Sequence, residues 1–230
     1  MNIEPVAFFR SPLKEKFGVP RQAGLVPVLK GEVRFVAPYD SPEAVRGLEE
    51  FDYVWLVWGF SLNGVQEFSP TVRPPRLGGN KRVGVFASRS PFRPNGLGLS
   101  CVKLESIEKG VLKVSGADLV DGTPIYDVKP YIEYADSRTG IRSGFVDYST
   151  WPTLEVDIPD KVLQLLGPDT AGVLSSLLSH DPRPHYQDDP ERVYGLCFGS
   201  YNVKFRAEGK KVFVLSAESI TFASNAEFDT

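Results

Sequence analysis

The sequence predicts a mainly β protein, with an antiparallel β-barrel domain, not of the Rossmann type, followed by a small C-terminal α+β domain. Fifteen Phe, nine Tyr and three Trp favour strands, and 21 Gly with 19 Pro imply many turns. The stretch 51–62 (FDYVWLVWGFSL) is apolar at both parities of a two-residue period, which is typical of a strand buried inside a barrel or under a subunit interface. Only one short helix is expected before residue 137, which favours an antiparallel barrel over a βαβ sheet. We place the barrel domain at 1–137 and the second domain at 138–230.

The predicted barrel strands follow one another along the first domain. Their expected ranges are 3–9, 32–36, 51–62, 100–108, 111–119 and 126–134. The pair Lys109-Gly110 is a turn signal, so the strands on either side of it should form a hairpin. Ser41-Pro42 is typical of a helix start, and this helix should end near residue 48. The segment 11–27 has no period, and unstructured loops of that length are often functional.

The second domain begins with helices and ends with strands. Leucines and valines at helical spacing predict helices at 160–166 and 169–178, separated by Gly167-Pro168. Strands at 196–206 and 211–219 should pair as a hairpin around Glu208-Gly209. The residues from 223 onward are expected to fray.

Composition excludes several classes of protein. A net charge of −3 argues against broad, non-specific nucleic-acid binding, although it leaves room for a local basic face. There is no apolar run near 18 residues, so no membrane span is expected. The absence of a secretory-signal pattern and of CxxC spacing favours a cytoplasmic location. Two His without further ligands at metal spacing predict no metal site, and neither a P-loop nor a GxGxxG motif after a strand is found.

The stretch 83–100 (VGVFASRSPFRPNGLGLS) is the first candidate for a binding site. Pro91 and Pro94 restrict its backbone, while Arg89 and Arg93 supply guanidinium groups. A short rigid loop of this kind can bind an anion or another polar ligand. The alternative is a plain connection between strands that carries two solvated arginines.

This candidate lies within a longer basic segment. Between Glu67 and Glu105 the chain has no acidic residue. The basic residues in this interval are Arg73, Arg76, Lys81, Arg82, Arg89, Arg93 and Lys103. Such a segment suits a phosphate-rich or carboxylate-bearing partner, with chance clustering on a solvated face as the alternative.

The second candidate is 118–131 (DLVDGTPIYDVKPY). It opens on a turn signature at 121–124 and continues as a strand. Asp127, Lys129 and Tyr131 share one parity, so their polar groups should lie along one face of that strand. This face is either a solvated barrel exterior or a polar site. Pro130 within the strand implies a sheet edge or a strand end.

Together, these stretches resemble the TsaA/TrmO family over nearly the whole chain. The matching motifs are 83–100, the turn at 121–124 with YDVKPY after it, FDYVWLVWGF, VPRQ at 19–22, DPRPHY at 181–186 and NVKFR at 202–206. The resemblance implies an S-adenosylmethionine-dependent methyltransferase that acts on N6 of threonylcarbamoyladenosine at position 37, in the tRNA anticodon loop. It also implies a non-Rossmann barrel, a homodimer, and a C-terminal domain that helps to hold tRNA.

The resemblance also implies cofactor contacts, position by position. They fall on Pro20, Arg21, Gln22, Arg89, Leu99, Asp121, Gly122 and Thr123. Where the family often has His-Gln after the double-faced strand, this chain has Ser61-Leu62, so contacts there are expected through the backbone. Arg21 or Arg89 could bind the methionine carboxylate, Asp121 could accept from the ribose, and Leu99 could pack on adenine.

Methyl transfer is an in-line displacement that depends on alignment of the reacting atoms. The acceptor is a urea-type N–H of poor basicity, which favours a positioned proton acceptor. Our hypothesis gives this role to Asp127 or Tyr131, with Lys129 tuning either one or binding the substrate. The residues expected to contact tRNA are Arg73, Arg76, Lys81, Arg82, Arg93 and Arg183.

Two other functions stay open at this point. One is a non-enzymatic RNA-binding or regulatory protein that retains the barrel and the cofactor pocket. The other is a methyltransferase with a different acceptor.

Overall fold

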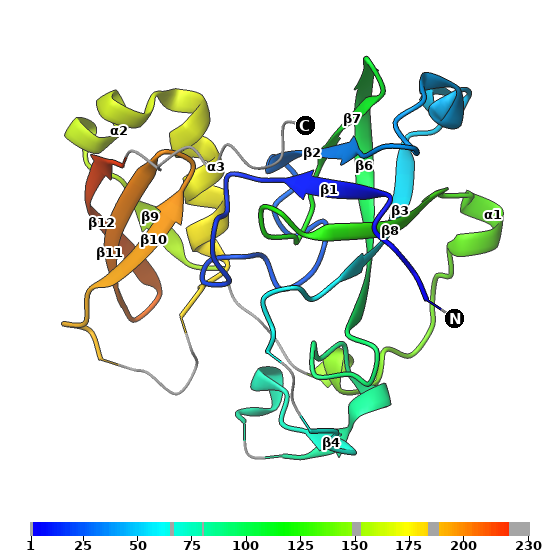
Figure 1. The fold of residues 1–230 in the computed structure, drawn as a ribbon. Coiled ribbons are helices and arrows are strands. Elements are labelled where there is room, and N and C mark those ends of the chain that lie inside the picture. Colours follow the sequence, from blue (N-terminus) through cyan, green and yellow to red (C-terminus); the bar gives the residue numbers. More distant parts are fainter. Residues whose placement is uncertain (1, 65–66, 80, 149–152, 184–188, 221–230) are drawn as a thin grey trace.

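The computed structural model describes residues 2–64, 67–79, 81–148, 153–183 and 189–220. It contains two hydrophobic cores, one inside a β-barrel and one under a small C-terminal sheet, and the two units lie side by side (Figure 1). Within the described residues, no helix is long and apolar enough to cross a membrane.

The barrel is closed and wholly antiparallel, as predicted. Its strands are joined in the order β1-β2-β7-β6-β3-β8. They span β1 (Ala7–Arg10), β2 (Lys30–Phe35), β3 (Tyr53–Gly59), β6 (Leu97–Glu108), β7 (Val111–Ser115) and β8 (Pro124–Pro130). The hairpin between β6 and β7 turns at Lys109 and Gly110, which both have positive φ, so that prediction is confirmed.

Several strand boundaries differ from prediction, and β7 ends at Ser115 rather than at residue 119. β1 begins only at Ala7, and β8 ends at Pro130, before the short helix α1 (Glu133–Asp136). Proline has no N–H for the ladder, so the strand end at Pro130 fits the position expected for it. β6 begins at Leu97, inside the stretch predicted as a loop, because Leu97 and Gly98 pair with the neighbouring strand β3.

β3 separates two different environments. Its inward side chains, Val54, Leu56 and Trp58, are buried in the barrel core. On the outer face, Tyr53 is 43% exposed, although Trp55 beside it is half-buried. The predicted two-faced strand is therefore packed on one face and left partly open on the other.

Short elements connect the barrel strands. After β2 come the 3-10 turns η1 (Pro42–Val45) and η2 (Leu48–Glu50), with the Ser41 side chain accepting from the Glu43 N–H. The predicted helix start is thus confirmed, but the turns are 3-10 rather than α-helical. Between β3 and β6 an excursion projects from the barrel, at the bottom of Figure 1. It contains β4 (Thr71–Val72), η3 (Pro75–Leu77), β5 (Val83–Gly84) and η4 (Val85–Ala87).

The C-terminal unit packs two helices against a four-stranded sheet of order β10-β11-β12-β9. Its elements are η5 (Gly144–Tyr148), β9 (Glu155–Asp157), α2 (Asp160–Leu166), α3 (Pro168–Ser179), β10 (Tyr194–Phe198), β11 (Tyr201–Glu208) and β12 (Lys211–Ser219). Both helices and the hairpin of β11 with β12 are confirmed. The prediction of one strand over 196–206 is wrong, because a turn at Gly199 (φ 58°) divides it into β10 and β11. The residues expected to fray lie outside the described part.

The loop 11–27 joins the two units. Leu13 is fully buried in the C-terminal core and pairs with Phe198, and Val26 lies in the same core. The Phe17 ring stacks on Tyr194 and on Phe205, with centroids 6.2 Å apart in each case. This loop is therefore part of the C-terminal core, although it lies between two barrel strands in the sequence.

Candidate functional site

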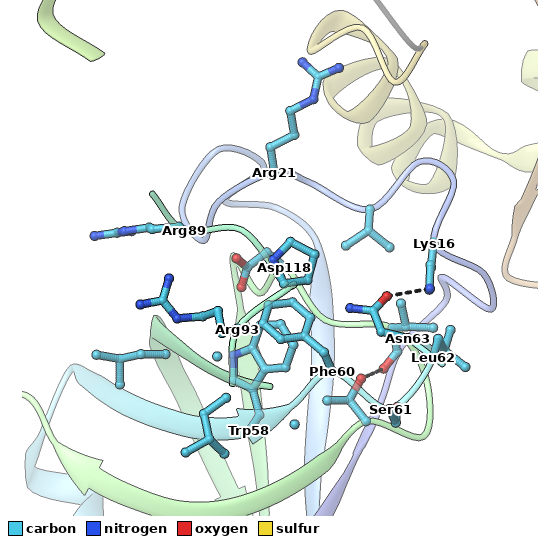
Figure 2. Close-up of a pocket in the computed structure, with 18 of the residues that line it drawn as sticks. Lys16, Arg21, Trp58, Phe60, Ser61, Leu62, Asn63, Arg89, Arg93 and Asp118 are labelled. Atoms are coloured by element: carbon cyan, nitrogen blue, oxygen red, sulfur yellow. Dashed lines mark hydrogen bonds between the residues drawn. The ribbon is translucent and has the colours of Figure 1, made fainter. Parts of the chain in front are cut away.

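A cavity of about 490 Å³ opens at the end of the barrel, a size typical of small-molecule sites. Residues of β3 and β6 form one wall, and the loop 11–27 with the segment after η4 forms the other. Figure 2 shows these walls facing each other. The lining residues that carry polar or aromatic groups are Lys16, Arg21, Gln22, Trp55, Trp58, Phe60, Ser61, Asn63, Ser88, Arg89, Arg93, Asp118 and Thr123.

A buried polar chain holds the strand wall. Trp58 Nε1 donates to Ser100 Oγ at 2.9 Å, and Ser100 Oγ donates to Asp118 Oδ1 at 2.5 Å. Burial raises the pKa of Asp118, and it outweighs the hydrogen bonds from Ser100 and from the backbone N–H groups of Asp118 and Ala23, together with the charge of Arg89, which lower that pKa. The cavity thus contains a largely buried carboxylate whose position is set by two barrel strands.

Aromatic rings form the floor beside this carboxylate. The Phe60 ring meets Trp58 edge-on, with centroids 4.4 Å apart. Gly98 lies under the indole so closely that a Cβ there would be 2.3 Å from Trp58 Cε2. Glycine at this position therefore allows the indole to lie flat on β6.

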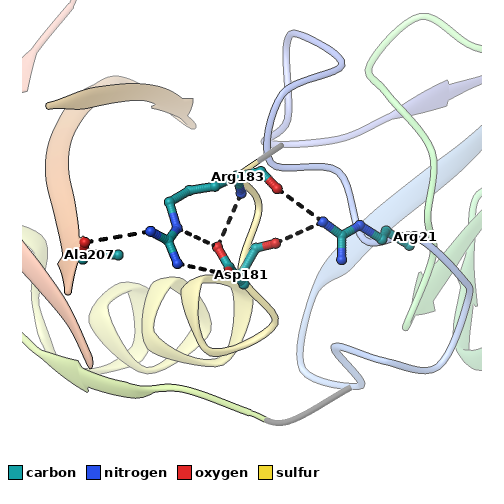
Figure 3. A network of polar contacts seen from close by, with 4 residues as sticks. All are labelled: Arg21, Asp181, Arg183 and Ala207. Carbon is teal, nitrogen blue, oxygen red and sulfur yellow. Dashed lines mark hydrogen bonds and ion pairs between the residues drawn. The ribbon is translucent and has the colours of Figure 1, made fainter. Parts of the chain in front are cut away.

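Hydrogen bonds hold the loop wall in two ways: some connect its own residues, and others connect it to the C-terminal unit. Arg89 Nη1 donates to Gln22 Oε1 at 2.5 Å, and Gln22 Nε2 donates to the Arg21 carbonyl at 2.6 Å. The Arg21 guanidinium points away from Asp118 in Figure 2. Its Nη2 donates to the carbonyls of Asp181 at 3.0 Å and Arg183 at 3.2 Å (Figure 3). Arg21 therefore anchors the loop to the C-terminal unit.

Asn63 closes one end of the cavity. Its Oδ1 accepts from Lys16 Nζ at 2.6 Å, which orients the amide so that Nδ2 is its donor end. Nδ2 is buried and has no hydrogen-bond partner among the described residues. A buried donor without a partner is costly, and a ligand acceptor would satisfy it.

The predicted cofactor residues fall into two groups. Eight line the cavity: Pro20, Arg21, Gln22, Ser61, Leu62, Arg89, Leu99 and Thr123. Asp121 and Gly122 do not, because the Asp121 carboxylate faces loop 11–27. It accepts from Lys14 Nζ at 2.8 Å and from the Ser11 N–H at 2.9 Å. Asp121 thus ties this turn to the loop rather than presenting its carboxylate to the cavity.

The predicted catalytic residues lie on the outer face of the barrel. Lys129 Nζ and Asp127 Oδ2 form an ion pair at 2.7 Å, with both side chains well exposed. The Tyr131 ring packs near Trp55, with centroids 5.8 Å apart. Since Trp55 lines the cavity, this face adjoins the site, but none of the three residues lines it.

The predicted tRNA-binding residues are distributed over the excursion and the C-terminal unit. Arg73, Lys81 and Arg82 are exposed, and Arg82 Nη1 donates to Thr71 Oγ1 at 3.2 Å. Arg93 lines the cavity and donates to the Ser88 carbonyl at 2.7 Å. The side chain of Arg76 lies outside the described part.

Arg183 differs from the others because its side chain is buried. It forms an ion pair with Asp181 at 2.8 Å, and its Nη1 donates to the Ala207 carbonyl at 3.5 Å (Figure 3). The guanidinium therefore braces the end of α3 against the sheet and is not presented to solvent.

Ser100, Asn63 and Asp118 are among the residues of the site that the sequence did not predict. Asp118 opens the motif 118–131, but the turn signature and the family resemblance in that motif point to Asp121 instead. The polar Ser100 shares the buried face of β6 with the apolar Val102 and Leu104, and this is the signal that could have revealed the network.

Comparison with known proteins gives matches over both units. Residues 8–137 match the family model described as the tRNA-methyltransferase O N-terminal domain, and residues 153–220 match the TrmO C-terminal domain. A tRNA (adenine(37)-N6)-methyltransferase of Escherichia coli is 39% identical over 228 residues, which cover 93% of this chain and 97% of that protein. RcsF of Pseudomonas aeruginosa, whose name describes an S-adenosylmethionine-dependent methyltransferase, is 41% identical over 85% of this chain and 87% of its own length. The crystal structure of TrmO from P. aeruginosa superposes with a TM-score of 0.77 at 32% identity and covers 95% of this chain and 99% of that one.

Proposed function

This chain belongs to the TrmO family, and we propose that it methylates N6 of threonylcarbamoyladenosine at position 37 of tRNA, with S-adenosylmethionine as methyl donor. Membership rests on both family models and on relatives matched over nearly their whole length. The observation that carries the proposal is the cavity, which combines an aromatic floor, a guanidinium and a buried carboxylate. Such a mixture suits a zwitterionic nucleoside.

The groups around the cavity match the chemistry of S-adenosylmethionine. A guanidinium such as that of Arg89 can bind a carboxylate, and the exposed side chain of Leu99 can pack against adenine. Asn63 Nδ2 is buried and has no hydrogen-bond partner in the described part of the chain, so it can donate to a ligand acceptor. When bound, S-adenosylmethionine supplies a methyl group made electrophilic by its sulfonium.

We assign the cofactor to the cavity-lining residues that the family pattern names. These are Pro20, Arg21, Gln22, Ser61, Leu62, Arg89, Leu99 and Thr123, with Asp121 and Gly122 shaping the turn beneath them. Arg21 contributes by holding the loop in place, because its guanidinium donates hydrogen bonds to the C-terminal unit.

We assign tRNA to the basic excursion beside the cavity. Arg73, Lys81 and Arg82 are exposed there, and the sequence supplies no carboxylate between Glu67 and Glu105 to compete with phosphate. Phe86 and Phe92 are also exposed on this side, and exposed aromatic rings can stack on unpaired bases. This arrangement suits a single-stranded loop such as the anticodon loop.

We also propose a homodimer that forms through the outer face of β3. Tyr53 is 43% exposed on this face, and the rings of Trp55 and Tyr131 beside it are half-buried, so aromatic surface lies open to a partner there. Tyr53→Glu should lower the molecular mass measured by light scattering from two chains to one. Leu163→Glu, at an exposed position of α2, is the control. A wild-type protein of one chain at micromolar concentration would contradict the dimer.

The first test is titration calorimetry with S-adenosylmethionine. Arg89→Ala should weaken binding at least tenfold, because the charge-assisted hydrogen bond to a carboxylate is lost. Arg34→Ala is the matched control, since Arg34 pairs with Glu32 on β2 outside the cavity. If the folded wild type fails to bind, with and without tRNA present, the pocket assignment is wrong.

The second test is methyl transfer to tRNA with and without the threonylcarbamoyl group. We expect transfer only to the threonylcarbamoylated tRNA. Equal transfer to the unmodified tRNA would replace the proposed acceptor with another. Binding of both ligands without transfer would instead favour a non-catalytic RNA-binding protein.

A further inference from the structure

The proposed reaction releases one proton, and the cavity has one group able to take it. Among the described residues that line the cavity, the ionisable side chains are Lys16, Arg21, Arg89, Arg93 and Asp118. The first four are cations at neutral pH and have no acceptor capacity. Asp118 is therefore the single carboxylate of the described lining.

We propose that Asp118 is the proton acceptor for N6 of the target adenosine, an inference that rests on the proposed function. As the bond from N6 to the methyl carbon forms, the bond from that carbon to sulfur breaks and its electron pair stays on sulfur. The N6 proton passes to the Asp118 carboxylate, which becomes neutral. This role replaces the earlier assignment to Asp127 or Tyr131, neither of which lines the cavity.

The hydrogen-bond chain fixes Asp118 as an acceptor. The indole N–H of Trp58 can only donate, so it occupies a lone pair of Ser100 Oγ and leaves the hydroxyl hydrogen for Asp118. Ser100 is only 2% exposed, and Trp58 is 7% exposed, so water does not compete for these bonds. An ionised carboxylate has about four acceptor sites, which leaves capacity for a substrate N–H beyond the Ser100 hydroxyl and the backbone N–H groups of Ala23 and of Asp118 itself.

The surroundings also make Asp118 a better base than an ordinary aspartate. Burial raises its pKa, and a higher pKa increases the driving force for accepting a proton from a poor acid. The opposing cation is Arg89, which lowers that pKa, while its guanidinium is hydrogen-bonded to Gln22. By contrast, Asp127 is exposed, and its carboxylate is already paired with Lys129 Nζ at 2.7 Å.

The test compares single-turnover methyl transfer with cofactor affinity in the full-length protein. Asp118→Asn should slow transfer about 100-fold or more, the usual contribution of a general base, while the affinity for S-adenosylmethionine changes less than threefold. Asp157→Asn, at an exposed position of β9 outside the cavity, is the matched control and should keep the wild-type rate. The wild-type rate should rise with pH to a plateau, and this rise should be absent in Asp118→Asn.

Two results would overturn the inference. The first is a transfer rate for Asp118→Asn within tenfold of the wild type. The second is an affinity for S-adenosylmethionine that falls as much as the rate, which would make Asp118 a cofactor-holding residue. If Asp118→Asn does not fold, Ser100→Ala, which removes the orienting donor, should slow transfer about tenfold at unchanged affinity; an unchanged rate there would count equally against it. Absence of transfer by the wild type would instead refute the proposed function itself, and Asp118 with it.

Discussion

The two walls of the cavity are held in different ways. In the strand wall, Trp58 and Ser100 come from β3 and β6, and their relative position follows from the register of an antiparallel ladder. In the loop wall, Gln22 and Arg89 come from segments without regular structure and meet through one side-chain hydrogen bond. The first wall is fixed by the closed barrel, whereas the second needs support from elsewhere.

That support comes from the C-terminal unit. None of its described residues lines the cavity, yet its core contains Leu13 and packs on Phe17 of the loop. Arg21 adds hydrogen bonds from the loop to the end of α3. The difference teaches that a domain can shape a binding site without touching the ligand. Each of the first three predictions below disturbs one wall and leaves the other in place.

The largest effect on stability is expected from Phe205→Ala, in the C-terminal core that supports the loop wall. Phe205 is fully buried and stacks on Phe17 and Tyr194, so its truncation should lower the free energy of unfolding by about 3–5 kcal/mol. Cofactor affinity should also fall, because Phe17 loses its support. Urea unfolding and calorimetry measure the two effects. Leu163→Ala, an exposed position of α2, should change neither.

Gly18→Ala should disturb the loop wall at its contact with the sheet. Gly18 has φ +89°, and a Cβ there would be 2.2 Å from Leu196 Cδ1. Strain and clash together should cost about 2–3 kcal/mol and weaken cofactor binding. Gly24→Ala separates the two causes, because Gly24 has φ +81° but no atom within 4 Å of a Cβ. Equal losses in the two variants would rule out the contact with Leu196 as the cause.

Gly98→Ala should disturb the strand wall alone. The added Cβ would displace the Trp58 ring and break its hydrogen bond to Ser100, at a cost of about 1–2 kcal/mol. Cofactor affinity should fall about tenfold, which calorimetry would detect. Gly84→Ala is the control, with no atom near its Cβ. An unchanged affinity for Gly98→Ala would show that the indole does not define the floor.

Two carboxylates should respond to pH with opposite signs. The pKa of Asp118 is raised in the folded state, so ionisation of this carboxylate lowers the stability of the wild type when the pH exceeds that pKa. Asp118→Asn removes the charge and should therefore raise Tm at neutral pH by roughly 2–4 °C. This gain should vanish below about pH 4, where the unfolded aspartate is also protonated. A lower Tm for Asp118→Asn at neutral pH would contradict the destabilisation assigned to the buried, ionised Asp118 carboxylate.

The hydrogen bond from Lys113 lowers the pKa of Glu32, so Glu32→Gln should be less stable at neutral pH. That loss should disappear as the pH falls through the folded-state pKa of Glu32.

The smallest effects are expected outside both walls, on the excursion. Arg73→Ala or Arg82→Ala should each lower the slope of log affinity for tRNA against log salt by about 0.7–0.9, without changing cofactor affinity. Binding measured at several salt concentrations gives the slope. An unchanged slope for both variants would remove the excursion from the tRNA surface, and Arg34→Ala provides the baseline.

Local patterns were enough to predict much of the fold. The turn pair Lys109-Gly110, the helices on either side of Gly167 and the two-faced strand at 51–62 all depend on residues close in the sequence. The errors arose where distant pairing decided the outcome. The local sequence predicts a loop at Leu97 and Gly98, but these residues form a strand because they pair with β3. The local sequence also predicts one strand over 196–206, which a turn at Gly199 divides into two.

The sequence by itself determined the barrel, the helical pair and the family motifs, because periodicity, turn chemistry and short motifs act within a few residues. Only the tertiary structure decided that Asp118, rather than Asp127, lies in the cavity, and that loop 11–27 belongs to the C-terminal core. The physical reason is that burial depends on residues distant in the chain. Asp118 owes its raised pKa to desolvation produced when the barrel closes and the loop folds over it.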